Sequence, residues 1–222
     1  DSATDNTKLP LAGGTMTGAI VLGTNTVGGL QITTTATENI GLGSGAVDSI
    51  TTGDYNTGVG HNSLTANTSG HRNSAFGRAS LAANTIGTYN TTIGMSSLTA
   101  NTEGNYNTAS GAYALTANIT GSYNTASGAY ALTTNTTGSY NSALSRQALY
   151  SNTTANYNTA AGSSALFTNT TGANNSAFGA DALLSNTTGA SNVAVGKSAL
   201  QANTTGNINT AVGLSALQAN TT

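Results

Sequence analysis

Few side chains in this chain are of types that catalyse reactions or bind metal ions. The sequence holds two histidines, no cysteine and seven acidic residues, which lie far apart: Asp1, Asp5, Glu38, Asp48, Asp54, Glu103 and Asp181. General acid–base catalysis by carboxylates requires two such groups to converge on one substrate. His61 and His71 have no neighbouring cysteine or acidic cluster that would complete a metal-ligand set. We therefore predict that the protein is not an enzyme, and we predict no catalytic residue, no metal site and no cofactor.

Other ligand-binding patterns are equally weak. The glycine-rich run at 41–45 lacks the Lys-Ser/Thr ending of a phosphate-binding loop, and no aspartate recurs as calcium-binding repeats require. Tyrosines do recur at fixed spacing, at Tyr89, Tyr106, Tyr123, Tyr140 and Tyr157. Such a series is typical of turn packing, and it could also form a platform for a glycan.

The spacing of those tyrosines belongs to a 17-residue repeat that runs without a slip from Gly53 to Thr222. We number each copy from 1 to 17, starting at Gly53 in the first of ten regular copies. The consensus is G-x-Y-N-T-A-x-G-x-x-A-L-x-A-N-T-T, with Asn at positions 4 and 15 and Leu at position 12 in all ten. A degraded eleventh copy covers 36–52. A period this short and regular predicts stacked coils.

The residues within each copy favour β-structure. Seventeen residues are too few for the common helical repeats, and glycines at positions 1 and 8 together with the closing Asn-Thr-Thr mark turns. We predict an all-β protein: a β-solenoid of about eleven coils over 36–222, with two short strands per coil and coils stacked ~4.8 Å apart. Residues 1–35 lack the repeat and are predicted to form an N-terminal cap or stem.

The columns formed by equivalent positions suggest a core. Positions 7 and 12 are mostly apolar, so we predict that they face inward. Small residues at positions 6 and 11 indicate close approach of another strand or another chain. The Asn columns are predicted to form amide ladders or to support left-handed turns. Ser145 replaces the glycine of position 8 and Ala155 the glycine of position 1, which predicts a local irregularity. Tyr150, Phe167 and Leu184 form an apolar stripe at position 13. That stripe is either a contact surface for another chain or a variation in packing.

Composition narrows the choice of partners. The net charge is −2 and the five basic residues are scattered, so we expect neither nucleic acid nor an anionic membrane surface as a partner. No apolar run approaches the length of a membrane span. The chain begins at Asp1 without a secretory signal pattern, and we expect it to be a processed or excised segment.

Two stretches resemble known proteins. Residues 9–20, L-P-L-A-G-G-T-M-T-G-A-I, resemble a segment of bacteriophage tail fibres and related viral fibre proteins. The repeat in 53–222 resembles units of such fibre-like proteins and, more distantly, the head repeats of trimeric autotransporter adhesins. The resemblance implies a homotrimer located on a virion tail or an extracellular surface. Such fibres often end in a self-cleaving chaperone domain; residues 206–222 do not resemble one, so we expect it to be absent or removed.

These observations together predict a structural fibre segment of a viral tail fibre or a surface adhesin. It would hold or present a region that attaches to a host-surface receptor or glycan, although the sequence identifies no receptor-binding residue. Two alternatives stay open: a self-assembling extracellular or cell-surface filament, and an ice-binding β-solenoid, because threonine columns are abundant.

Overall fold

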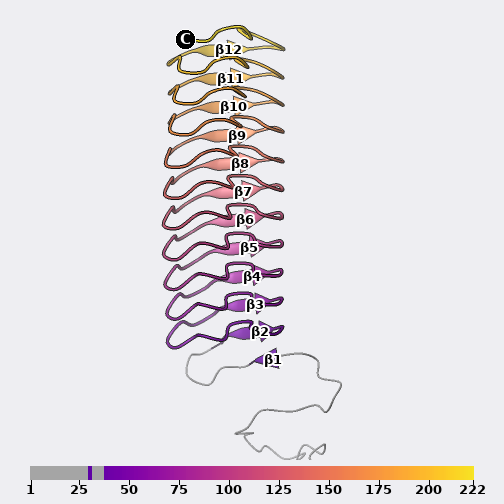
Figure 1. Cartoon of the computed structure of the whole chain (residues 1–222), viewed down its shortest axis with the longest axis vertical. Coiled ribbons are helices and arrows are strands. Elements are labelled where there is room, and N and C mark those ends of the chain that lie inside the picture. Colours follow the sequence, from indigo (N-terminus) through magenta and orange to yellow (C-terminus); the bar gives the residue numbers. More distant parts are fainter. Residues whose placement is uncertain (1–29, 32–37) are drawn as a thin grey trace, which may run out of the picture.

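The computed structural model describes residues 30–31 and 38–222 and shows an all-β solenoid (Figure 1). Its first strand is β1 (Leu30–Gln31). Eleven three-residue strands follow, one per coil: β2 (Ile40–Leu42), β3 (Thr57–Val59), β4 (Ser74–Phe76), β5 (Thr91–Ile93), β6 (Thr108–Ser110), β7 (Thr125–Ser127), β8 (Ser142–Leu144), β9 (Thr159–Ala161), β10 (Ser176–Phe178), β11 (Val193–Val195) and β12 (Thr210–Val212). The described residues contain no helix. The predicted β-solenoid is confirmed.

One sheet runs the whole length of the stack, with its strands in the order β1 to β12. From β2 to β12 neighbouring strands are parallel, and each residue pairs with the residue seventeen places on, as Ala109 does with Ala126. β1 instead pairs antiparallel with β2, placing Leu30 opposite Leu42. The cap or stem predicted for 1–35 otherwise lies outside the described residues.

Each coil contains one strand, and the prediction of two strands per coil was wrong. The second segment is a series of turns, because the backbone at positions 10 and 12 is left-handed: φ is 59° at Tyr113 and 55° at Leu115. These two residues curl the chain where a strand would continue straight. The segment still bonds along the stack, since Leu115 N–H donates to the carbonyl of Ala131 at 2.9 Å.

Backbone hydrogen bonds run along the stack in both directions. Thr108 N–H, at position 5, donates to the carbonyl of Asn124 in the next coil at 2.8 Å. Gly111 N–H, at position 8, donates to the carbonyl of Ile93 in the preceding coil, also at 2.8 Å. Position 12 follows the first pattern and position 10 the second. Each coil is therefore held by its neighbours on both sides through donors as well as acceptors.

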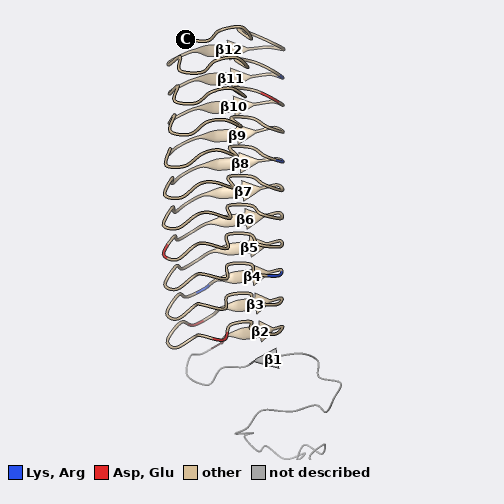
Figure 2. Cartoon of the chain, viewed as in Figure 1, with Lys and Arg blue, Asp and Glu red and all other residues tan. Residues whose placement is uncertain are grey.

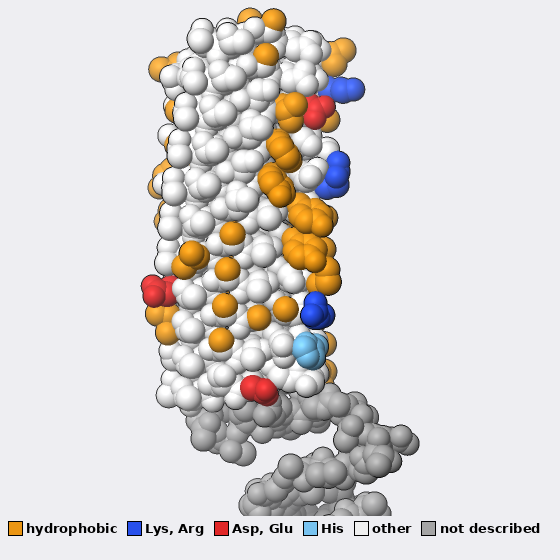
Figure 3. All heavy atoms as spheres, viewed as in Figure 1, with side chains coloured by type: hydrophobic (Ala, Val, Ile, Leu, Met, Phe, Trp, Pro, Cys, Tyr) orange, Lys and Arg blue, Asp and Glu red, His pale blue; other side chains and the backbone are white. Residues whose placement is uncertain are grey.

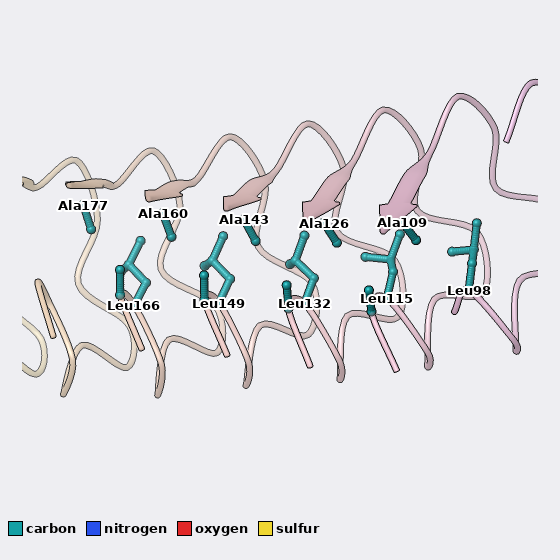
Figure 4. Close-up of a cluster of buried hydrophobic side chains, with 14 of the residues drawn as sticks. Leu98, Ala109, Leu115, Ala126, Leu132, Ala143, Leu149, Ala160, Leu166 and Ala177 are labelled. Atoms are coloured by element: carbon teal, nitrogen blue, oxygen red, sulfur yellow. The ribbon is translucent and has the colours of Figure 1, made fainter. Parts of the chain in front are cut away.

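The core contains alanine at position 6, serine or alanine at position 11 and leucine at position 12. In Figure 4 the leucines from Leu98 to Leu166 and the alanines from Ala109 to Ala177 face each other across the inside of the coils. Complete burial of each leucine contributes about 1.5–3 kcal/mol, repeated once per coil. Position 7, predicted to face inward, points outward instead. Successive side chains of a strand point to opposite faces of the sheet. Because Ala109 at position 6 is buried, its neighbours at positions 5 and 7 point toward solvent.

Two buried columns of asparagine form hydrogen-bonded ladders. Of the two roles predicted for these columns, amide ladders or support of left-handed turns, the structure shows the first. At position 15, Asn118 Nδ2 donates to Asn101 Oδ1 at 2.8 Å and to the carbonyl of Gly121 at 2.9 Å. At position 4, Asn107 Nδ2 donates to the same Gly121 carbonyl at 2.8 Å, and Asn107 N–H donates to Asn90 Oδ1. Two side chains of one coil thus converge on the carbonyl that opens the next.

That convergence explains the glycine at position 1. A Cβ on Gly121 would overlap both Asn118 Oδ1 and the carbonyl oxygen of Gly138. Ala155 is the one exception among the regular copies, and its carbonyl still accepts from Asn141 Nδ2 at 2.8 Å and Asn152 Nδ2 at 3.1 Å.

The irregularity predicted around Ser145 does not reach the strand register. β8 and β9 pair in the same way as the other strands, with Ser142 opposite Thr159. The backbone of Ser145 also keeps the regular geometry: its φ of 136° is about the value that glycine takes at the same position of other coils, such as 135° at Gly111. A non-glycine residue is strained in this conformation.

We expect Ser145→Gly to stabilise the protein by about 0.5–1.5 kcal/mol, because relief of the backbone strain exceeds the added entropy of the unfolded chain. Urea unfolding followed by circular dichroism measures the change. Ser142→Gly, in strand β8, should instead destabilise the fold. A lower midpoint for Ser145→Gly would contradict the assignment of strain.

We expect Asn118→Ala to destabilise the protein by about 2–4 kcal/mol, because it removes two donors and leaves Asn135 Nδ2 without its 2.9 Å acceptor in the interior. The matched control is Thr120→Ala, two residues away and exposed, which should change the free energy of unfolding by less than about 0.5 kcal/mol. Equal effects of the two changes would show that the ladder does not hold the stack together.

Candidate functional surfaces

The acidic residues in the described part of the chain are scattered over several positions of the repeat. Asp48, Asp54, Glu103 and Asp181 lie at positions 13, 2, 17 and 10 of four different coils, and Glu38 lies at position 3 of the first (Figure 2). Asp1 and Asp5 lie outside the described residues. Within the described part of the chain no group of three His, Cys, Asp or Glu residues is close enough to hold a metal ion. His71 is engaged locally, where its Nδ1 accepts a hydrogen bond of 3.0 Å from the backbone N–H of Asp54.

Three of the basic residues, described above as scattered, occupy the same position of the repeat. Arg78, Arg146 and Lys197 all occupy position 9, together with His61, and so share one edge of the stack (Figure 2). Arg78 and Arg146 are four coils apart, roughly 19 Å at the spacing of hydrogen-bonded strands. This separation exceeds the screening length of about 8 Å at physiological ionic strength. Arg78 and Arg146 therefore act independently of each other and do not combine into one anion-binding surface.

The tyrosines of position 3 form a continuous stack on the outside of the solenoid, which we call the tyrosine ladder. It consists of Tyr89, Tyr106, Tyr123, Tyr140 and Tyr157. Neighbouring ring centroids are 4.8–5.0 Å apart, and the rings are within 8° of parallel. Because each inner ring is covered on both faces by its neighbours, the ladder exposes ring edges and hydroxyls. A glycan needs open aromatic faces, so the inner rungs do not offer the platform considered from the sequence.

An arginine extends the ladder at one end. Arg72 occupies position 3 between Tyr55 and Tyr89, and its guanidinium carbon lies 5.1 Å and 5.4 Å from the centroids of those two rings. Its Nη1 also donates to the Tyr89 hydroxyl at 3.0 Å. The planar cation thus takes the place of a ring. The spacing of seventeen residues from Tyr55 was a signal that sequence reasoning could have used.

The outer face of the sheet carries two columns side by side. Position 5 is threonine or serine in most coils, and position 7 is apolar in most. Most position-7 side chains are exposed although many are large; Ile93 is 54 % exposed and Phe178 44 %. We call this apolar series the strand-face column: Leu42, Val59, Phe76, Ile93, Leu144, Ala161, Phe178, Val195 and Val212. Ser110 and Ser127 interrupt it at β6 and β7.

A second hydrophobic stripe lies on the turn segments, visible as a band along one side of the stack in Figure 3. Tyr113 and Tyr130, at position 10, stack with their centroids 5.2 Å apart. Tyr150 and Phe167, at position 13, stack at 5.1 Å. Tyr150, Phe167 and Leu184 are half-buried within their own chain, so packing between neighbouring coils accounts for at least part of this stripe.

Comparisons with protein-family models, with curated proteins and with solved structures found no match to this chain. Among the described residues, no helix has the length and apolar character needed to cross a bilayer. The function must therefore be argued from the surfaces themselves.

We expect Tyr123→Ala to destabilise the protein by about 1–3 kcal/mol, because the change removes two ring stacks worth about 0.5–1.5 kcal/mol each. Tyr157→Ala removes one stack, at the end of the ladder, and should cost about half as much. Denaturant midpoints of the two variants provide the comparison. If both cost the same, ring stacking does not explain the ladder.

Proposed function

We propose that this chain is a structural rod: a homotrimeric segment of a viral tail fibre or a surface adhesin, which holds or presents a region that attaches to a host surface. The observation that carries the proposal is the strand-face column. It runs from β2 to β12 on the outward face of a straight sheet, and its large side chains are exposed in the single chain. Soluble proteins rarely leave an apolar surface of this extent without a partner, even one interrupted as this one is at Ser110 and Ser127.

The geometry of the column suits other copies of the same chain. The strands stack in register along the long axis of the rod (Figure 1). Equivalent side chains of neighbouring coils therefore follow one another in a line parallel to that axis. Parallel rods placed face to face could bury this line along their whole length, and closed symmetry gives such an assembly a defined size. The position-6 alanines, also considered for contact between chains, are buried within one chain and cannot serve.

The rest of the rod is consistent with a mechanical role. Its sides carry threonine, serine and asparagine with few charges, and hydrogen bonds join every described coil to the next. A surface-exposed or virion location is part of the proposal and is supported by the resemblance of residues 9–20 to viral fibre proteins.

Ice binding is a second candidate, favoured by the threonines of position 5 on the flat sheet, which lie at the regular spacing of neighbouring strands. A second hydroxyl column beside it would be needed, and the strand-face column contains phenylalanine, isoleucine and leucine there. We therefore place this function behind the structural rod.

The trimer is tested by light scattering coupled to gel filtration. We expect a mass of about three chains of 21.8 kDa for the native sequence. Ile93→Asp combined with Phe178→Asp should give single chains, because burial of two charges in an apolar interface is unfavourable. Thr137→Asp combined with Thr171→Asp adds the same charge at exposed position 17 and should remain trimeric.

A single-chain mass for the native protein would rule out the trimer, and inhibition of ice recrystallisation would then be measured. Large particles whose size grows with concentration would identify the end-to-end filament instead.

A further inference from the structure

The tyrosine ladder also places phenol groups where they can react with one another. The five rings stack at 4.8–5.0 Å, so like atoms of consecutive rings lie above one another along the ladder. The rings are accessible as well: exposure rises from 42 % at Tyr89 to 59 % at Tyr157. A small oxidant can therefore reach every rung, and the side chains have room to tilt.

We propose that the ladder is a site of oxidative cross-linking, in which hydrogen peroxide and a haem-type peroxidase join tyrosines of consecutive coils as dityrosine. Each of two phenols loses one electron and one proton and becomes a phenoxyl radical. The two radicals form a carbon–carbon bond between ring carbons ortho to the oxygens. The hydrogens on those carbons then return to the phenolic oxygens. One hydrogen peroxide accepts the two electrons and two protons and becomes two molecules of water.

The fold favours coupling within one chain. Consecutive rings are held next to each other by the sheet register, as Thr108 opposite Thr125 holds Tyr106 beside Tyr123. Reactants held in this way behave as if at very high concentration. The remaining approach, from ring stacking to bonding distance, is made by rotation of exposed side chains. A radical at one end of the ladder has a neighbour within 5.0 Å at each step and can pass along it.

The product would be a series of covalent cross-links between consecutive coils of the rod. Each cross-link closes a loop of 17 residues, since the linked tyrosines occupy the same position of adjacent coils. Cross-links of this kind restrict the unfolded chain. The chain has no cysteine, so no disulfide can perform this task. We infer that oxidation converts the rod into a form that resists unfolding.

The chain contains its own controls. Tyr55 lies in the same column but is separated from Tyr89 by Arg72, so it has no adjacent tyrosine in the ladder. Tyr150 stacks on Phe167, which cannot form a phenoxyl radical. Tyr113 and Tyr130 form one further stacked pair outside the ladder. Four of the five stacked tyrosine pairs therefore belong to the ladder.

The experiment treats the dilute full chain with horseradish-type peroxidase and hydrogen peroxide and measures dityrosine fluorescence. Denaturing gels report whether the links join chains, and mass spectrometry after digestion with an elastase-type protease locates them. We expect links between consecutive rungs from Tyr89 to Tyr157, chains that remain of single-chain size on the gel, and a melting temperature higher than before oxidation.

Three variants make the test specific, and all keep planar side chains in the column. Tyr106→Phe combined with Tyr140→Phe leaves no two adjacent tyrosines in the ladder, so the dityrosine yield should fall to about one fifth, the share of the Tyr113–Tyr130 pair. Tyr55→Phe combined with Tyr150→Phe removes the same number of phenols and should leave the yield unchanged. Arg72→Tyr should extend the cross-links to Tyr55.

The proposal is overturned if oxidation gives no dityrosine, or if the links lie mainly between chains. It is also overturned if the Tyr106→Phe, Tyr140→Phe variant cross-links as well as the native chain, because random coupling of exposed tyrosines would then explain the product. Circular dichroism before oxidation confirms that each variant keeps the native fold.

Discussion

The rod depends on one carbonyl per coil. The oxygen of the opening residue, such as Gly121, accepts hydrogen bonds from Asn107 and Asn118 of the preceding coil, and both amides are buried. The interior is too narrow for an ordinary hydrophobic core, since it holds little more than one leucine and two small residues in each coil. Polar groups must therefore lie inside, and a buried amide is tolerated only when its donors are satisfied. A shift of one residue between coils would leave these donors unpaired, so the ladders fix the register as well as contributing to stability.

Much of this architecture could be predicted from the sequence, because a repeat without slips fixes what lies above and below every residue. The solenoid, the 17-residue pairing and the amide ladders all followed from period and residue type. The number of strands did not, since the left-handed conformation of Leu115 and Tyr113 runs against the usual preference of these residues and leaves no trace in composition. Position 7 was assigned to the core because it is apolar. Its variation in size, from serine to phenylalanine, was the better signal: identical coils offer identical cavities, so a buried column must be uniform, as the leucines of position 12 are.

The same logic separates interior from surface chemistry. Inward-facing positions are nearly invariant from coil to coil, whereas outward positions change freely and acquire their properties as columns. Position 3 became a tyrosine ladder, position 7 an apolar line and position 9 an edge with three separated cations. The acidic residues illustrate the limit of such a surface, because side chains at different positions of different coils do not converge. A solenoid of this kind builds extended, repetitive contact surfaces more readily than a catalytic centre.

The opposed directions of the backbone hydrogen bonds have an electrostatic consequence. In an α-helix all peptide dipoles point the same way and leave partial charges at the two ends. Here the N–H of Thr108 points to the coil after it, and the N–H of Gly111 points to the coil before it. These dipoles partly offset one another within each coil, so the axial field grows more slowly with length than it would if all of them were aligned. This partial cancellation lowers the electrostatic cost of each added coil, which favours change in the length of such a rod by whole copies of the repeat.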